Sequence, residues 1–263
     1  MNNANLITKQ YLLSPAAGKR LIAKALLSSA SIADALENRT IVIVAGTTNA
    51  YVAEEFLSKI GQASDFSMKN FFRGITLPPV KTPANASSSP SDQNQFLGDV
   101  VIVKGKWDKG KTIFDVADSL QQGDIIIKGA NAVNVESQQA AIYIGHPTGG
   151  TISAALQAVI GKRVELYLPV GLEKRISGDI HKIARKLNSP NASGPRYMPV
   201  SGNIITELDA VRLLTGAYPE LVACGGVCGA EGSCWIAATG TAEQLEHLDG
   251  LMPLLKNEPN FSL

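Results

Sequence analysis

Three short loops, rich in glycine and in hydroxyl or amide side chains, contain the residues best suited to bind a small ligand. They are Gly46-Thr47-Thr48-Asn49, Lys128-Gly129-Ala130-Asn131 and His146-Pro147-Thr148-Gly149-Gly150. Glycine exposes backbone N–H groups, hydroxyls add donors, and a helix that begins in such a loop favours negative charge at its N-terminus. The pattern predicts a binding site for a phosphate or a carboxylate. The alternative, in which the loops are only helix caps and turns, stays open.

Two side chains in these loops have the chemistry to move a proton. His146 lies just before a predicted helix, and an imidazole titrates close to neutral pH. Its alternative is a histidine on a surface loop. Lys128 follows three isoleucines, where an unpaired ammonium is costly to bury. We therefore expect it to contact an anion or to act as an amine of lowered pKa, with pairing to Asp124 or Glu136 as the structural alternative.

The sequence gives no reason to expect a metal or another cofactor. Cys224, Cys228 and Cys234 lie in CGGVCGAEGSC, which lacks the paired Cys-x2-Cys spacing of a metal site, and no two histidines have ligand spacing. Small reduced thiols between glycines are the expectation. A redox or cluster site is the alternative.

Composition excludes several classes of function. Of 263 residues 45% are hydrophobic and 18% charged, and the net charge is +1, which gives no basic surface for nucleic acid or for an anionic membrane. No apolar run reaches the roughly 18 residues of a membrane helix, and residues 1–5 do not resemble a secretion signal. We expect a cytoplasmic protein whose partner is a small anionic metabolite. Self-association into a homo-oligomer stays open.

The elements that must position the loops alternate between strands and helices. Strands are predicted at 41–44, 100–103, 125–127 and 164–168, with amphipathic helices at 52–60, 113–120, 151–160 and 180–187. This alternation is typical of an α/β fold with a parallel, Rossmann-like sheet and helices on both faces. Residues 82–95 have no apolar periodicity and are predicted to form a mobile insertion.

A boundary is predicted at Ser193-Gly194-Pro195, where glycine and proline interrupt the pattern. Residues 1–195 would then form the ligand-binding α/β domain. Residues 196–263 are predicted to fold as a small α+β domain of the ferredoxin-like kind, resembling a lid. Its expected order is a strand at 197–205, a helix at 207–214, strands at 221–224 and 234–238, and a helix at 242–255.

In this order the motifs resemble the superfamily of ribose-5-phosphate isomerase, glucosamine-6-phosphate deaminase and CoA transferases. IVIVAGTTNAYVAEEF resembles the isomerase's strand, phosphate loop and helix, and GDIIIKGANAVN resembles the strand that ends in Asp-Gly-Ala-Asp. GHPTGGTISAAL stands in place of its glycine-rich lysine loop, and RVELYLPVGLEKRI in place of a strand with a short polar loop. The Thr-Asn and Ala-Asn-Ala segments are also similar to lactate-utilisation domain proteins.

The resemblance implies the fold and a sugar-phosphate or acyl/CoA-type ligand. It also places Lys128 and Asn131 where the isomerase has its two carboxylates, and His146 near the position of its loop lysine. The expected function is an enzyme-like protein that binds a small phosphorylated or carboxylated metabolite. A non-catalytic binding or sensing protein of the same fold is the alternative.

We predict that the protein does not isomerise ribose 5-phosphate at an enzymatic rate. Proton transfer through an enediol needs a general base, and losing one costs about 10² to 10⁴ in rate. A coupled assay should therefore stay far below the ordinary range of roughly 1 to 10³ turnovers per second. Turnover within that range, abolished by His146→Ala, would contradict the prediction and make His146 the base.

Overall fold

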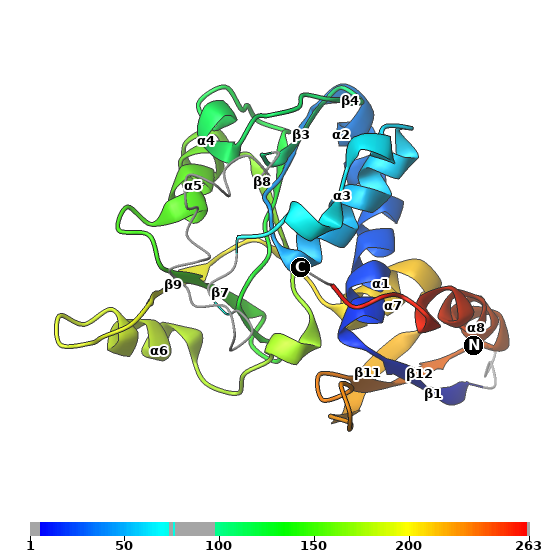
Figure 1. Ribbon diagram of the computed structural model, residues 1–263. Coiled ribbons are helices and arrows are strands. Elements are labelled where there is room, and N and C mark those ends of the chain that lie inside the picture. Colours follow the sequence, from blue (N-terminus) through cyan, green and yellow to red (C-terminus); the bar gives the residue numbers. More distant parts are fainter. Residues whose placement is uncertain (1–5, 74–75, 77–97, 262–263) are drawn as a thin grey trace.

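A computed structural model gives the structure of residues 6–73, 76 and 98–261 (Figure 1). The insertion expected at 82–95 lies outside these described residues. The fold is α/β, and the described residues form three sheets. In the part of the chain that the structure describes, none of the helices has both the length and the apolar character needed to cross a membrane.

The central sheet has six strands in the order β10-β8-β5-β2-β3-β4. Their bounds are Asn203–Ile205, Glu165–Pro169, Ile125–Ile127, Thr40–Ile43, Val100–Val103 and Lys106–Trp107, in that order. The first four strands run parallel, whereas β3 is antiparallel to β2, and β4 to β3. The expected parallel core is therefore four strands wide within a mixed sheet.

Helices cover both faces of this sheet, as the alternation predicted. Those around it are α1 (Pro15–Ser28), α2 (Ala30–Asn38), α3 (Thr47–Lys59), α4 (Ile113–Val116) and α5 (Gly150–Lys162). Ile41 and Ile43 of β2 pack with residues of α1 and α3, whereas Val42 packs with residues of α4 and α5. Successive side chains of a strand point to opposite faces, so one apolar run supplies two cores.

A second sheet has the antiparallel order β1-β12-β11 and lies against two further helices. Its strands are Ile7–Leu13, Cys234–Gly240 and Tyr218–Cys224, and the helices are α7 (Glu207–Thr215) and α8 (Ala242–Lys256). The elements predicted in 207–255 are all present. Their sheet takes an edge strand from the N-terminal segment, however, because β1 pairs along its whole length with β12.

The third sheet is β6 (Ala132–Asn134), β7 (Gln139–Ile144) and β9 (Arg196–Val200), with α6 (Ile180–Leu187) packed beside it. The single strand expected at 197–205 is wrong: β9 joins this sheet and β10 joins the central one. Gly202 lies where the chain passes from β9 to β10, and an added Cβ there would come within 2.8 Å of the Leu166 carbonyl oxygen. The sheets therefore do not divide at residue 195.

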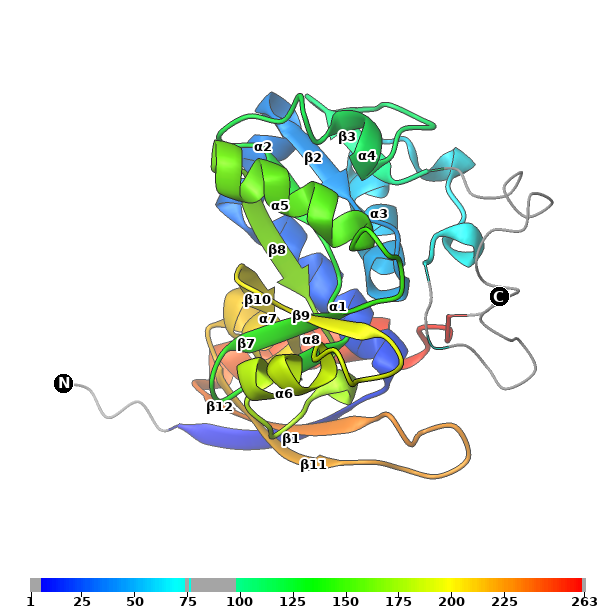
Figure 2. The ribbon, with the colours of Figure 1, turned by 90° about the vertical axis from the view of Figure 1, so that its left-hand side faces the viewer.

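The carboxyl ends of the parallel strands face the two smaller sheets. Figure 2 shows the arrow of β8 pointing toward β7, β9 and the β1–β11–β12 layer. The loops after β2, β5 and β8 therefore lie where three layers meet. Such an edge is the usual place for a ligand in an open α/β sheet.

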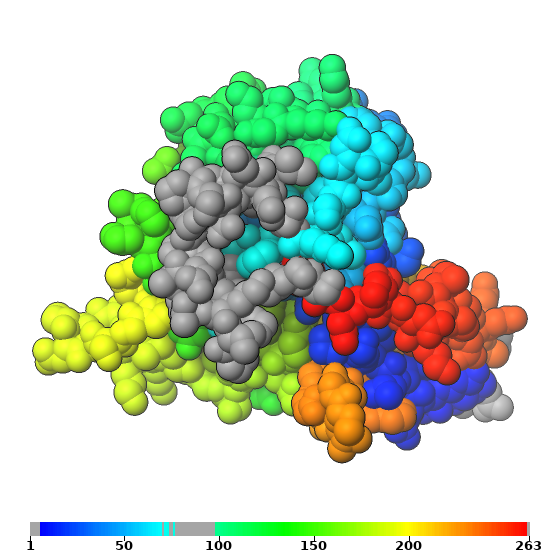
Figure 3. Space-filling view, viewed as in Figure 1, coloured from blue at the N-terminus to red at the C-terminus, as the bar shows by residue number. Residues whose placement is uncertain are grey.

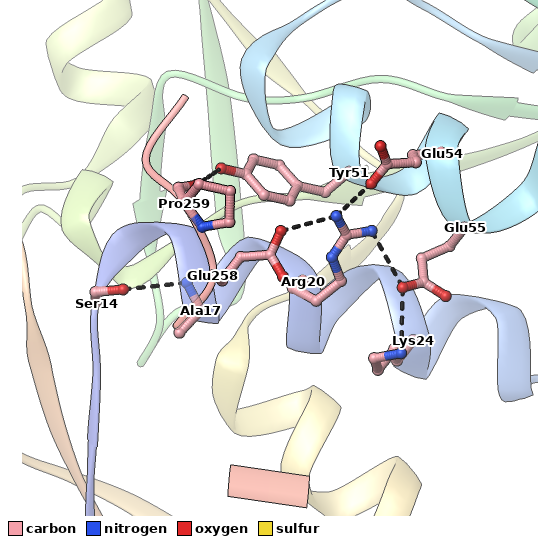
Figure 4. Close-up of polar contacts among 9 residues, drawn as sticks. All are labelled: Ser14, Ala17, Arg20, Lys24, Tyr51, Glu54, Glu55, Glu258 and Pro259. Atoms are coloured by element: carbon pink, nitrogen blue, oxygen red, sulfur yellow. Dashed lines mark hydrogen bonds and ion pairs between the residues drawn. The ribbon is translucent and has the colours of Figure 1, made fainter. Parts of the chain in front are cut away.

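A buried arginine holds α1, α3 and the C-terminal segment together (Figure 4). Arg20 is 8% exposed and donates to Glu55 at 3.1 Å, to Glu258 at 2.8 Å and to Glu54. Burial alone would lower its pKa, but the bonds to Glu258 and Glu54 outweigh burial and raise the pKa of Arg20. Tyr51 adds a bond of 3.0 Å to the carbonyl of Pro259.

Replacing Arg20 should destabilise the fold strongly. Arg20→Met leaves its carboxylate partners without their shared cation, and breaking a buried pair from one side costs about 3 to 5 kcal/mol. Urea denaturation measures the loss. The matched control is Arg212→Met, because Arg212 forms an exposed pair of 3.7 Å with Asp209 and such pairs contribute about 0 to 1 kcal/mol. Equal losses in the two variants would contradict this role.

Candidate functional site

The loop after β2 becomes the first turn of α3, and its asparagine faces inward. Asn49 is fully buried, and its Nδ2 donates to the carbonyls of Val44 at 2.6 Å and Ile127 at 3.0 Å. Its Oδ1 is also buried and has no hydrogen-bond partner among the described residues. Asn49 therefore ties the ends of β2 and β5 together. This contact explains its burial without a ligand, although it was predicted as a ligand-binding residue.

A carboxylate that the sequence analysis missed supports the same turn. Asp99, just before β3, is fully buried and accepts from the backbone N–H groups of Ala45 and Ile113, each at 2.8 Å. It also accepts from Arg73 at 2.6 Å. Because β3 is antiparallel to β2, the start of β3 lies at the carboxyl end of β2. A single aspartate before a strand gives no sequence signal of this role.

Lys128 stands at the end of β5, directly after the residue whose carbonyl binds Asn49. It is 9% exposed, and no hydrogen bond or ion pair to its ammonium is found among the described residues. The pKa of Lys128 is lowered to about 8; burial is the largest cause, the Arg73 cation also lowers it, and Asp99 opposes the shift. The pairing with Asp124 or Glu136 that the sequence left open is not present: Asp124 instead accepts from the backbone N–H groups of Thr40 and Gln121.

A second lysine reaches the first turn of α3 from the neighbouring strand. After β8 the chain forms the short 3-10 helix η4 (Leu172–Lys174). The Lys174 ammonium donates to the Thr48 hydroxyl at 3.4 Å. Burial lowers the pKa of Lys174, with Glu173 and Glu207 acting against burial and Lys19 with it. Thr48, which is 2% exposed, thus links the loops after β2 and β8.

Two carboxylates lie beside Lys174. Glu207, at the start of α7, is 3% exposed and accepts from the Leu172 N–H at 2.9 Å. Gly18 of α1 makes room for it, because a Cβ there would lie 2.3 Å from its Oε1. Burial raises the pKa of Glu207, and the charge of Glu173 raises it further. Sequence reasoning missed Glu207, since it reads only as an acidic residue in a first helical turn.

Glu173 completes the group. Both of its carboxylate oxygens are buried and have no hydrogen-bond partner among the described residues. Its nearest cation is Lys19, whose ammonium lies 3.6 Å from Oε1, an ion-pair distance beyond ordinary hydrogen-bond length. The site therefore contains two carboxylates and Lys19 and Lys174 in a shielded region, beside Thr48.

The remaining predicted residues lie on the hairpin side of the same edge. Gly129 passes close to β8, where a Cβ would lie 3.8 Å from the Pro169 carbonyl oxygen. Asn131 is exposed, accepts from the Tyr143 N–H at 3.0 Å and donates through its own N–H to Ala141. It therefore fixes the base of the β6–β7 hairpin.

The His146 loop begins α5 and is open to solvent. His146 and Thr148 are exposed, and the imidazole Nδ1 lies 2.8 Å from the Thr148 hydroxyl. Gly149 and Gly150, with φ of 85° and 62°, turn the chain into the helix. Among the described residues no hydrogen bond or ion pair joins this loop to Lys128 or Lys174. The structure thus brings together the loops after β2, β5 and β8, while the His146 imidazole, among the described residues, has hydrogen bonds only with Thr148 of its own loop.

Comparison of the chain with models of protein families, with curated proteins and with solved structures gives no match. In the described part of the chain, no group of three or more His, Cys, Asp or Glu side chains is arranged to hold a metal ion.

Removing the charge of Lys128 should stabilise the protein at neutral pH. The fall of its pKa from 10.5 to about 8 corresponds to about 3 kcal/mol of cost to the folded state. The cost is full below pH 8, where folded and unfolded states are both charged. It fades as pH rises toward 10.5, because only the unfolded state then keeps the proton.

Lys128→Met should therefore raise the free energy of unfolding by up to about 3 kcal/mol at pH 7, and the gain should fall by about half at pH 9.5. Chemical denaturation at the two pH values measures both quantities. Lys182→Met, which alters an exposed lysine on α6, is the control and should show neither effect. Destabilisation by Lys128→Met at pH 7 would show that its charge is compensated in the folded protein.

Proposed function

We propose that the protein binds a small phosphorylated or carboxylated metabolite where β2, β5 and β8 end. The observation that carries this proposal is the pair of lysines at adjacent strand ends. Lys128 is buried and Lys174 half-buried, and neither forms an ion pair with a carboxylate among the described residues. Both lie next to residues of the first turn of α3, through Asn49 and Thr48.

The cost of burying an unpaired ammonium favours a bound anion at this edge over a site without one. Buried charges in proteins are normally paired, because an isolated ammonium loses most of its hydration without compensation. The first turn of α3 adds backbone N–H groups with no partner inside the helix and the positive end of its dipole. A phosphate or carboxylate at this edge would satisfy these donors together, which is the arrangement that small-anion sites use.

The same edge supports proton transfer, so we favour an enzyme over a passive binder. Glu207 has a raised pKa and lies in the group formed with Glu173 and Lys174. A carboxyl group that keeps its proton near neutral pH can donate it to a bound substrate and take it back. A binding or sensing protein of the same fold is the second candidate, because the anion site functions without Glu207.

This assignment accords with the resemblance to the isomerase, deaminase and CoA transferase superfamily, including the small lid-like unit, which remains our proposal for the fold. We still do not expect ribose-5-phosphate isomerase activity. Asn131 binds the β6–β7 hairpin through the Tyr143 N–H, and Lys128 provides no carboxylate to act as the general base. Mass spectrometry of small molecules released from the natively purified protein should find a phosphorylated or carboxylated compound. The identity of that compound would indicate which class of substrates to assay.

Sulfate is the probe for the anion site because its charge does not change above neutral pH. Calorimetry should show that Lys128→Met and Lys174→Met each weaken sulfate binding by about 10- to 100-fold, the effect of losing one hydrogen bond to a charged group. Thr48→Val should weaken it less, and the control Lys182→Met should leave it unchanged.

The pH dependence provides a second readout. Affinity for sulfate should fall as pH rises through about 8, where Lys128 loses its proton, and Lys128→Arg should flatten that part of the profile. Unchanged affinity in folded Lys128 and Lys174 variants would place the anion elsewhere. No binding of sulfate or inorganic phosphate to the wild type would refute the proposed site.

A further inference from the structure

The hairpin of β11 and β12 brings two cysteines face to face. Cys224 ends β11, Cys234 begins β12, and the two are direct partners in the antiparallel register. Their sulfur atoms lie 3.9 Å apart, and both are free thiols. Cys224 is exposed, whereas Cys234 is 3% exposed. The third cysteine, Cys228, is exposed in the loop between them.

The backbone geometry at this pair suits a disulfide. The Gly225 N–H donates to the Ser233 carbonyl at 2.8 Å. Gly225 and Ser233, which lie opposite each other, are therefore a hydrogen-bonded pair of the hairpin. The neighbouring Cys224–Cys234 pair is then of the non-hydrogen-bonded kind, in which Cα atoms lie about 4.5 Å apart and side chains are closest. This separation falls within the roughly 4.4 to 6.8 Å that disulfides span.

The two thiols differ in a way that assigns them roles. Burial raises the pKa of Cys234, and the neighbouring Glu207 and Cys224 raise it further, so this sulfur stays protonated. Cys224 is the sulfur that solvent reaches. An exposed thiol that meets the oxidant first and a buried thiol that closes the bond are the two parts of a dithiol exchange site.

We propose that Cys224 and Cys234 form a reversible disulfide by exchange with a low-molecular-weight disulfide such as oxidised glutathione. The Cys224 thiolate attacks one sulfur of the oxidant, and the other sulfur leaves as a thiolate. Cys234 then loses its proton and attacks the Cys224 sulfur, which releases the second thiol. Two protein thiols are oxidised and one disulfide of the oxidant is reduced.

The proposal is independent of the anion site but places the disulfide at its border. Cys234 lies within the electrostatic reach of Glu207, and Gly232 packs near Glu173, where an added Cβ would lie 3.8 Å from the Glu173 Cβ. The loop between the strands, orange in Figure 3, stands at the surface of the molecule. An oxidant therefore reaches Cys224 without opening the fold.

The test uses the full-length reduced protein and oxidised glutathione. After alkylation of remaining thiols, cleavage behind glutamate separates Cys224 and Cys228 from Cys234, because Glu231 lies between them and Glu220 precedes them. We expect a linked pair of peptides, a mass loss of two hydrogen atoms in the intact chain, and full reversal by dithiothreitol. Cys228→Ser should give the same link, which assigns it to Cys224.

Two further variants fix the order of the steps. Cys234→Ala should stop at a mixed disulfide of glutathione on Cys224, and Cys224→Ser should form no link to Cys234. Since Cys224 is exposed, its variant keeps the test valid if the change at buried Cys234 disturbs folding. A link between Cys224 and Cys228 in place of the cross-strand pair, or glutathione on Cys224 of the wild type without further reaction, would overturn the proposal.

Discussion

The side-chain amide of Asn49 donates to the carbonyls of both Val44 and Ile127, and the geometry of the candidate site depends on this pair of bonds. Each carbonyl lies at the carboxyl end of a parallel strand, so one side-chain amide bridges the ends of two neighbouring strands. It thereby fixes the first turn of α3 against β5 and holds Lys128 beside it. Asp99 supports the turn from the other side through the Ala45 N–H.

Arg20 and the two lysines of the proposed site differ in how their charges are balanced. Arg20 is surrounded by Glu54, Glu55 and Glu258, and its charge is fully compensated within the chain. Lys128 and Lys174 have no comparable ion pair among the described residues, and burial lowers the pKa of both. A compensated charge stabilises the fold, whereas an uncompensated one costs stability, and under the proposed function a bound anion would offset that cost. This contrast is the physical basis for separating the structural network from the site.

The acidic groups of the site come from positions that the resemblance does not indicate. The proposed resemblance places Lys128 and Asn131, at the end of β5, where the isomerase has carboxylates. The fold supplies Glu173 from the loop after β8 and Glu207 from the start of α7. These two are separated by more than thirty residues in the chain and meet only because β10 adds to β8 in parallel. Under the proposed function, proton transfer at this edge would therefore use carboxylates from other positions than those of the isomerase.

Local pattern determined the elements, and long-range pairing decided how they assemble. Apolar runs and caps predicted the strands that become β2, β3, β5 and β8 and the helices between them, because burial and capping act within a few residues. The Gly46–Asn49 loop was likewise recognisable. The sequence did not reveal that β1 pairs with β12 or that 197–205 spans two sheets, since register depends on partners far away in the chain. For the same reason it predicted Lys128 but neither Glu207 nor Asp99, whose roles come from burial against other elements.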